Sequence, residues 1–224
     1  MHHVKRALSC ALLIIIMVIG FTLSVTIQVS ADASGLITII SSDTIWTRAD
    51  SPYNLTGPIL VDGVTLTIEA GVTVTMNDYE ILVHGTLRAI GSSTEKILFD
   101  HGTIKFSPYS NGWDEQTDSG CVFDYCYLNY SWIVSNVSLR LTNSRLGMMY
   151  LDDSSLISNN ILNSPIDVGS YNTISNNSGS SDITAEDSNV IYNSNLTRIR
   201  AGDSNTIHNN IIRMETEVGQ SIRL

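Results

Sequence analysis

The phrase NTISNN (Asn172–Asn177) recurs as NVIYNS (Asn189–Ser194) and as NTIHNN (Asn205–Asn210). Extended toward the N-terminus, the same register pairs an aliphatic residue with an asparagine two positions later, at a nearly constant step along the chain. The aliphatic residues are Leu141, Ile157, Ile174, Ile191 and Ile207, and the asparagines are Asn143, Asn159, Asn176, Asn193 and Asn209. Self-similarity at a fixed short period predicts a repeat architecture.

The first half of the chain also contains repeats, but their sequences differ from those of the second half. ILVDGVTL from Ile59 returns as ILVHGTL from Ile81, and FDHGTI from Phe99 returns as FDYCYL from Phe123. The segments are short, rich in β-branched residues and separated by Asn, Asp, Ser and Gly, with no helical periodicity. Such units cannot bury an apolar side alone, so they must stack on one another. The sequence therefore predicts an all-β parallel β-solenoid in which each repeat forms one coil.

The recurring aliphatic residue and asparagine have a structural explanation. We expect the aliphatic side chain to point into the interior and to stack on its counterpart in the next coil. The asparagine is expected at a corner, because Asn tolerates the left-handed conformation of a tight bend. Amides stacked at the coil spacing of about 4.8 Å can hydrogen-bond along a ladder. These asparagines are therefore predicted to be structural rather than catalytic.

The sequences of the repeats also resemble those of a known superfamily. Trp46, SPY at 51–53 and GPILVDGVTLTIEAGVTV at 57–74 resemble the opening coils of the pectin-lyase-like superfamily, and the NTIxNN phrases resemble NosD-like repeats. The resemblance implies a right-handed, single-stranded parallel β-helix in an exported archaeal or bacterial surface protein. It indicates fold better than function, because this fold carries lyases, hydrolases, adhesins and inactive surface proteins.

Three segments are expected along the chain. A basic start, an apolar run from Ala7 to Ile27 and the A-x-A site at 31–33 predict a signal peptide over 1–33, with an uncleaved membrane-anchoring helix as the alternative. Either interpretation places the rest outside the cytoplasm, secreted or at the cell surface. An N-terminal cap is expected over 34–57, followed by solenoid coils over 58–224 with an inserted loop at 107–120.

Charge and cysteine content restrict the partners. The chain has 12 Lys and Arg against 22 Asp and Glu, a net charge of −10. This argues against nucleic acid or an anionic lipid surface as a partner. Cys121 and Cys126 are expected to be half-buried thiols, with a disulfide that closes a turn as the alternative.

The sequence offers no ordered catalytic set. Polygalacturonide hydrolases of the resembled superfamily typically carry N-T-D, D-D, H-G and R-I-K elements in that order. This chain has HG at 101–102, DD at 152–153 and RIR at 198–200, in another order and without N-T-D. If the protein is a polysaccharide lyase or glycoside hydrolase, Asp100, Asp114 and Asp124 are the expected carboxylates. No histidine has metal-ligand spacing, so no metal or cofactor is expected, and Ca²⁺ has only weak support.

The insertion is the expected binding segment. SPYSNGWDEQTDSG at 107–120 interrupts the repeat, and long insertions in solenoids commonly gather on the binding side. Aromatic faces stack on the apolar faces of sugars, although the same residues also favour strands. The ligand-binding candidates in and after the insertion are Tyr109, Trp113, Tyr125, Tyr127 and Trp132.

The resulting hypothesis is an exported, non-catalytic structural, adhesion or glycan-binding module, with a polysaccharide lyase or hydrolase as the alternative. Its partner would be a surface glycan or another envelope protein. The final stretch RMETEVGQSIRL (213–224) offers no polar cap, so association through an open last coil, or a longer parent protein, is also expected.

Overall fold

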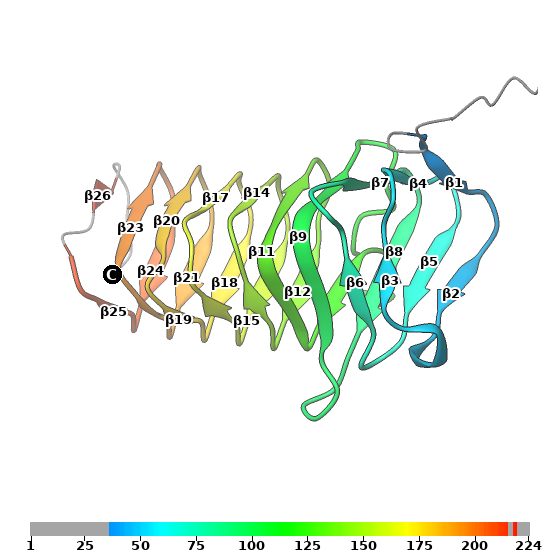
Figure 1. Ribbon diagram of the computed structural model, residues 1–224. Coiled ribbons are helices and arrows are strands. Elements are labelled where there is room, and N and C mark those ends of the chain that lie inside the picture. The colour runs from blue at the N-terminus through cyan, green and yellow to red at the C-terminus, as the bar shows by residue number, and fades with distance from the viewer. Residues whose placement is uncertain (1–35, 215–216, 219–224) are drawn as a thin grey trace, which may run out of the picture. The chain divides into compact units, whose positions relative to one another are not determined.

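The computed structural model describes residues 36–214 and the backbone of residues 217–218 (Figure 1). The predicted signal or anchor at 1–33 and most of the stretch 215–224 lie outside the described residues. Within the described part, strands β1 to β26 pair in parallel in two sheets of 17 and 9 strands. The coils stack along one axis, from the blue strands to the orange ones in Figure 1. The predicted parallel β-solenoid is confirmed.

Each coil has three sides, which we name faces A, B and C in chain order. Face A contains β1 (Thr38–Ile40), β4 (Ile59–Val61), β7 (Glu80–Val83), the second half of β9 (Ile97–Phe106), the second half of β11 (Cys126–Ser135), β14 (Met149–Leu151), β17 (Ile166–Val168), β20 (Asp182–Ala185), β23 (Arg198–Ala201) and β26 (Glu217–Val218). Face B contains β2 (Thr44–Trp46), β5 (Thr65–Ile68), β8 (Thr86–Ile90), β10 (Val122–Asp124), β12 (Arg140–Thr142), β15 (Leu156–Ser158), β18 (Thr173–Ser175), β21 (Val190–Tyr192) and β24 (Thr206–His208).

Face C contains the remaining strands and the first halves of the two long ones. Its other members are β3 (Tyr53–Asn54), β6 (Thr73–Thr75), β13 (Arg145–Leu146), β16 (Ile161–Leu162), β19 (Ser178–Gly179), β22 (Asn195–Leu196) and β25 (Ile211–Ile212). Strands β9 and β11 run around the corner from face C to face A, which joins these two faces into the 17-stranded sheet. A short 3-10 helix, η1 (Arg48–Asp50), lies between β2 and β3.

Coil length divides the solenoid into two regions. The first coils are long, and in the coil that contains the insertion the register partners Asp100 and Asn129 are 29 positions apart and Arg88 and Val122 are 34 positions apart. Later coils are shorter, and the hydrogen bonds from Ser144 to Asn160 and from Asn160 to Asn177 span 16 and 17 positions. The change falls after Ile133, which pairs with Ile104 before it and with Met149 after it. We call the two parts the wide region (38–135) and the narrow region (136–214).

The core is a stack of inward side chains along the axis. The central column of face B consists of Trp46, Ile68, Ala89, Phe123, Leu141, Ile157, Ile174, Ile191 and Ile207, each at most 7% exposed. The inward position predicted for the recurring aliphatic residue is therefore confirmed. In the wide region Phe99, Phe106 and Phe123 fill the larger cross-section, with ring centroids 5.7 and 6.0 Å from that of Phe123.

The repeated asparagine has the expected backbone but not the expected side-chain ladder. Asn143, Asn159, Asn176, Asn193 and Asn209 all have positive φ, between 51° and 60°. The last four side chains are exposed, and Asn143 donates to Asp124 instead of to another Asn of the series. The left-handed backbone turns the side chain of each corner asparagine outward. The hydrogen-bonded ladder is formed instead by the residue that follows each corner asparagine, such as Asn177 after Asn176.

Two buried polar ladders line the interior of the narrow region. In the first, the residue after each corner accepts from the backbone N–H of its counterpart one coil earlier; for example, Asn177 Oδ1 accepts from Asn160 N–H at 2.9 Å, and Asn177 Nδ2 donates to the Ile157 carbonyl at 2.8 Å. The members of this ladder are Ser144, Asn160, Asn177, Ser194 and Asn210. The members of the second, which precedes face B, are Ser155, Asn172, Asn189 and Asn205.

Two further expectations can be compared with the structure. Part of the predicted N-terminal cap is itself the first coil, because β1, β2 and β3 pair in register with β4, β5 and β6.

Cys121 and Cys126 are free thiols, as favoured, but both are fully buried. The positive φ of Tyr125 at the corner between them allows both to face inward despite their odd spacing. The described residues contain no helix with the length and apolarity needed to cross a bilayer.

Candidate ligand-binding site

The five aromatic residues proposed for binding lie on different sides of the solenoid. Trp113 lies beside face B, Tyr127 is on face C and Trp132 is on face A. Tyr125 is at the corner that follows face B, and the exposed Tyr109 packs its ring edge against His84 at a centroid distance of 5.7 Å. The five residues therefore do not form one surface, although Tyr127 and Trp132 both line a hollow at the corner between faces C and A.

The insertion is fastened to the coils on both sides of it. Asn111 N–H donates to the Gly85 carbonyl at 2.8 Å, one coil earlier. Trp113 N–H donates to the Ser138 carbonyl, and Ser138 Oγ returns a hydrogen bond to the Trp113 carbonyl, both at 2.8 Å, one coil later. The insertion thus bridges coils and lies against the solenoid.

Part of face B is covered by this segment. Val122 pairs with Arg88 and Arg140 at the outward position of face B, yet it is completely buried and lies outside the central core cluster. Arg88 Nη1 donates to the Gly120 carbonyl at 3.1 Å across the same position. We infer that the insertion shields Val122 from solvent, which gives the segment an apolar anchor of its own.

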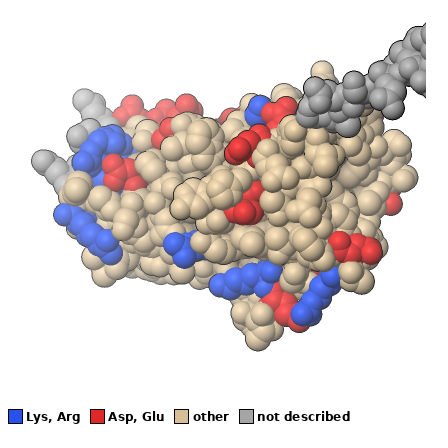
Figure 2. Space-filling view, viewed as in Figure 1, with Lys and Arg blue, Asp and Glu red and all other residues tan. Residues whose placement is uncertain are grey.

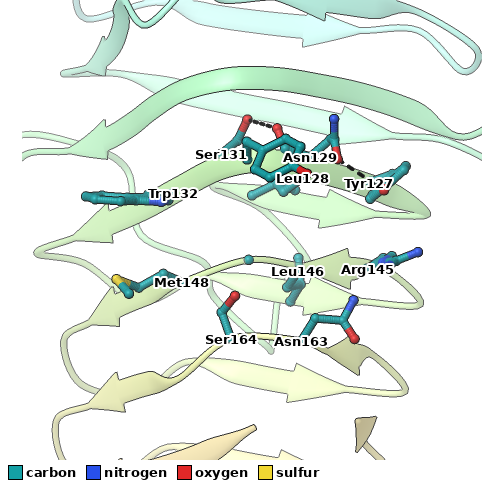
Figure 3. A pocket seen from close by; sticks show the side chains of 12 residues that line it. Tyr127, Leu128, Asn129, Ser131, Trp132, Arg145, Leu146, Met148, Asn163 and Ser164 are labelled. Atoms are coloured by element: carbon teal, nitrogen blue, oxygen red, sulfur yellow. Dashed lines mark hydrogen bonds between the residues drawn. The ribbon is translucent and has the colours of Figure 1, made fainter. Parts of the chain in front are cut away.

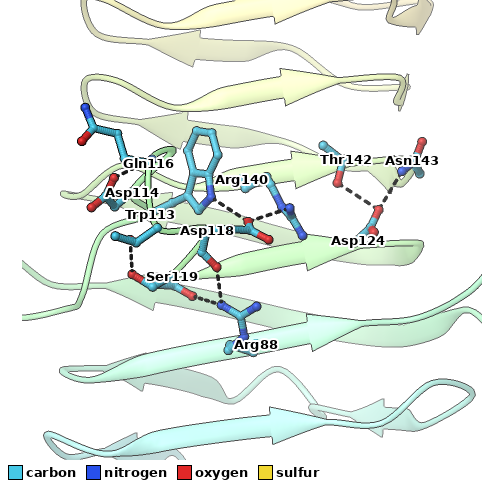
Figure 4. Close-up of polar contacts among 12 residues, drawn as sticks. Arg88, Trp113, Asp114, Gln116, Asp118, Ser119, Asp124, Arg140, Thr142 and Asn143 are labelled. Atoms are coloured by element: carbon cyan, nitrogen blue, oxygen red, sulfur yellow. Dashed lines mark hydrogen bonds and ion pairs between the residues drawn. The ribbon is translucent and has the colours of Figure 1, made fainter.

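Polar contacts fix the Trp113 side chain (Figure 4). The carboxylate of Asp118 accepts a hydrogen bond from Arg140 Nη1 at 2.8 Å and one from Trp113 Nε1 at 3.4 Å. Asp114 Oδ1 accepts from Gln116 N–H at 2.8 Å, and this bond, followed by one from the Thr117 side chain, lowers the pKa of Asp114 below its usual value. The insertion therefore presents an oriented indole beside an ionised carboxylate at neutral pH.

A groove runs between the insertion and face B. Its volume is about 510 Å³, and it is lined by Trp113, Asp114, Glu115, Ser154, Ser155, Leu156, Tyr171, Thr173 and Tyr192. Leu156 and Thr173 are register partners in adjacent coils, and Tyr192 belongs to the coil after them. The groove thus extends over three coils, which stack at about 4.8 Å per coil.

Sequence reasoning did not find Tyr171 and Tyr192 as binding candidates. Tyr171 is 67% exposed at the corner that precedes β18. Tyr192 lies on the outward side of face B, and its ring stacks on that of His208 at 5.2 Å with an interplanar angle of 11°. The repeated phrase does reveal that Tyr192 and His208 share one outward column. Their proximity to Trp113 depends on the path of the insertion, which the phrase does not reveal.

The three carboxylates named for a possible enzyme have separate environments. Asp100, on face C, binds His101 Nδ1 at 2.8 Å and Asn129 Nδ2 at 2.7 Å. Asp124, on face B, accepts from Thr142 Oγ1 at 2.9 Å and from Asn143 Nδ2 at 2.8 Å. Asp114 lies in the insertion. No contact joins any two of the three, and the described residues contain no group of three or more His, Cys, Asp or Glu positioned to hold a metal ion.

Charged side chains of both signs occur in small groups on the face seen in Figure 2, where uncharged residues cover most of the surface. The described residues therefore show no large basic patch on this face. Comparison of the chain with protein-family models, with curated proteins and with solved structures gave no match.

Proposed function

We propose that this protein is an exported, non-catalytic glycan-binding module whose ligand lies in the groove between the insertion and face B. One observation carries the proposal: a fixed Trp113 indole, two further tyrosines and two carboxylates line one groove that extends across three coils. The proposal includes the right-handed, pectin-lyase-like type of β-helix with NosD-like repeats. It also includes secretion or surface display directed by residues 1–33.

The lining chemistry favours a polysaccharide. Indole and phenol rings offer flat faces to the apolar side of a pyranose ring, and carboxylates accept hydrogen bonds from its hydroxyls. Because Asp114 is ionised and Glu115 stands beside it in a chain of net charge −10, an acidic polysaccharide would be repelled. The expected ligand is therefore a neutral glycan that runs along the solenoid axis.

The lyase or hydrolase alternative has weaker support. Glycoside hydrolysis needs two carboxyl groups at about 5–5.5 Å or about 6.5–9.5 Å across the scissile bond. The groove offers only Asp114 and Glu115, which are neighbours in one turn, and Asp100 and Asp124 are hydrogen-bonded elsewhere. An envelope protein as the partner is a separate proposal, and so is association through the last coil; residues 215–216 and 219–224 lie outside the described residues.

A retention experiment tests this proposal. The purified full chain is incubated with neutral and acidic polysaccharides, and binding is followed together with new chain ends by mass spectrometry. We expect retention on a neutral glycan without new ends and at least a tenfold loss of affinity in Trp113→Ala. The matched control is Trp132→Ala on face A, which should bind normally.

Two results would contradict the proposal. New chain ends that disappear in Asp114→Asn would make the protein an enzyme. Equal retention by Trp113→Ala and the unmodified chain would place any glycan site elsewhere. Asp118→Asn tests the orientation of the indole separately from its presence. The variant keeps the Trp113 side chain but removes the negative charge that orients it, so binding should weaken by a few fold.

A further inference from the structure

A second hollow lies at the corner between faces C and A (Figure 3), and it shares no lining residue with the groove. Its volume is about 310 Å³. It is lined by Tyr127, Leu128, Asn129, Tyr130, Ser131, Trp132, Arg145, Leu146, Gly147, Met148, Asn163 and Ser164. The upper coil contributes β11, and the two coils below contribute the residues around β13 and the end of β16.

The hollow forms where the wide region ends. Strand β11 rounds the corner with Tyr130, whose φ is 47° and whose side chain is exposed. The next coil turns the same corner at Gly147, where a Cβ atom would lie 2.5 Å from the Ser131 carbonyl oxygen. Adjacent coils therefore approach each other closely at Gly147, and the hollow lies beside this contact, next to the exposed Tyr130.

One cation is fixed at the edge of this hollow. The guanidinium of Arg145 lies over the Tyr127 ring, 5.0 Å from its centroid. The Asn163 side-chain amide is oriented with its oxygen toward Arg145. This oxygen accepts hydrogen bonds from Arg145 Nε at 2.6 Å and from Arg145 Nη2 at 3.1 Å. Arg145 forms no ion pair with any Asp or Glu among the described residues, although the chain carries a net charge of −10. Its Nη1 group is not used by Asn163.

The remaining walls combine polar side chains with aromatic and thioether surface. Trp132 is 50% exposed and Tyr130 is 76% exposed, and Met148 lies beside them. The lining contains no Asp or Glu. The Asn129 amide is already occupied, because its oxygen accepts from Tyr127 Oη at 3.2 Å and its nitrogen donates to Asp100 at 2.7 Å. The hollow therefore combines one positive charge, no negative charge, and aromatic and thioether surface.

We propose that this corner hollow binds a carboxylate carried on an apolar or aromatic body, with Arg145 as the partner of the carboxylate. The guanidinium pairs with carboxylates through directed N–H bonds, and its stacking on Tyr127 limits the entropy lost on binding. Trp132, Tyr130 and Met148 contact the apolar body. The chemistry fits a free aromatic acid or the last residue of a peptide. The proposal does not rest on glycan binding, because the two sites share no lining residue.

Paired ligands test the charge requirement on the unmodified full chain. N-acetyl-phenylalanine is titrated against N-acetyl-phenylalaninamide, which has the same body without the negative charge, and binding is followed by the indole N–H resonance of Trp132. We expect the acid to bind at least tenfold more tightly than the amide. A peptide that ends in free Phe distinguishes the sources: tighter binding than the single residue indicates a chain terminus, and equal binding indicates a free acid.

Variants then separate binding from a purely structural role of Arg145. Arg145→Gln should lose at least tenfold in affinity for the acid, whereas Arg145→Lys should retain part of it, and Arg213→Gln, a cation elsewhere on the solenoid, should bind normally. Equal affinity for acid and amide would overturn the proposal. So would unchanged binding by Arg145→Gln with a lowered melting temperature, since Arg145 would then only join coils. Tighter binding of galacturonate than of N-acetyl-phenylalanine would overturn the apolar half of the proposal.

Discussion

The wide and narrow regions build the same solenoid from different interiors. In the wide region the long coils enclose Phe99, Phe106 and Phe123. In the narrow region the short coils keep aliphatic residues of each strand inside and devote buried corner positions to Asn and Ser. The narrow region thus relies on columns of buried Asn and Ser at its corners, whereas three phenylalanine rings fill the interior of the wide region.

The difference has a physical cause. A short coil must bend sharply, and each bend leaves backbone N–H and C=O groups turned inward without a strand partner. Buried backbone groups are costly unless they are paired. An Asn amide satisfies a donor and an acceptor at once, which explains the ladders through Asn177 and Asn189. The longer coils have room for apolar side chains instead.

The largest effect is expected from a core deletion in the wide region. Phe123→Ala should lower the free energy of unfolding by about 4 kcal/mol, because it removes a buried ring and leaves a cavity between two other rings. Ile174→Ala, in the same column of the narrow region, should cost about 3 kcal/mol. Chemical denaturation followed by circular dichroism measures both. A larger loss for Ile174→Ala would mean that the narrow core is the more tightly packed of the two.

The next effect concerns the buried ladder. Asn177→Leu should destabilise the protein by about 3 kcal/mol, because it leaves the Asn160 N–H without a partner in the interior and removes the hydrogen bond to the Ile157 carbonyl. The same denaturation experiment measures it. Retention of full stability would show that burial of an apolar side chain offsets both lost hydrogen bonds, and the contrast between the two regions would then disappear.

Alkaline pH should act on the wide region through its thiols. Burial raises the pKa of Cys121 from 9.0 to about 11 and that of Cys126 further. Because the folded state holds these protons more tightly, the stabilising contribution is complete below pH 9 and is lost as the pH rises toward 11. For Cys121 the loss at pH 10 should be about 1 kcal/mol. Cys121→Ala should remove that part of the pH dependence, and an unchanged profile would contradict the assignment.

The smallest loss of stability is expected at the exposed corner residue Asn176, in contrast to its buried neighbour Asn177. Asn176→Leu should cost only about 1 kcal/mol, because its exposed side chain forms no ladder and the cost comes from a left-handed φ of 55°. Asn176→Gly, which relieves the backbone constraint, is the control and should be near neutral. If Asn176→Leu lowered the stability as much as Asn177→Leu does, the exposed Asn176 would contribute as much as the buried ladder residue, and the assignment of the ladder to Asn177 would be wrong. Differential scanning calorimetry on the three variants gives the ranking.

Much of the fold could be predicted from particular residues. The register of Leu141, Ile157, Ile174, Ile191 and Ile207 indicated the coil length, the parallel pairing and the inward side. The assignment of the ladder failed by one residue, because Asn176 and Asn177 are adjacent and both suit a bend. Only the sign of φ at Asn176 decides which side chain turns inward, and the alternation of an extended strand does not apply there.

The candidate site was predicted less well. Trp113 was identified through the interruption of the repeat, but Tyr125, Tyr127 and Trp132 were grouped with it by nearness in the chain. A coil passes through three faces within a short stretch of chain, so neighbours such as Tyr127 and Trp132 lie on different sides of a corner. Tyr171 and Tyr192, far along the chain, are the residues that share the groove with Trp113.

The sequence by itself determined the repeat, the strand direction and the apolar stack, because these follow from a period that every coil obeys. Only the tertiary structure decided which asparagine is buried, how the insertion covers Val122, and which aromatic residues meet in the groove and in the corner hollow. Periodicity specifies which residues occupy equivalent positions in successive coils. Contacts made by corners and insertions depend on backbone angles and on packing across coils, and these contacts occur where the repeat is broken.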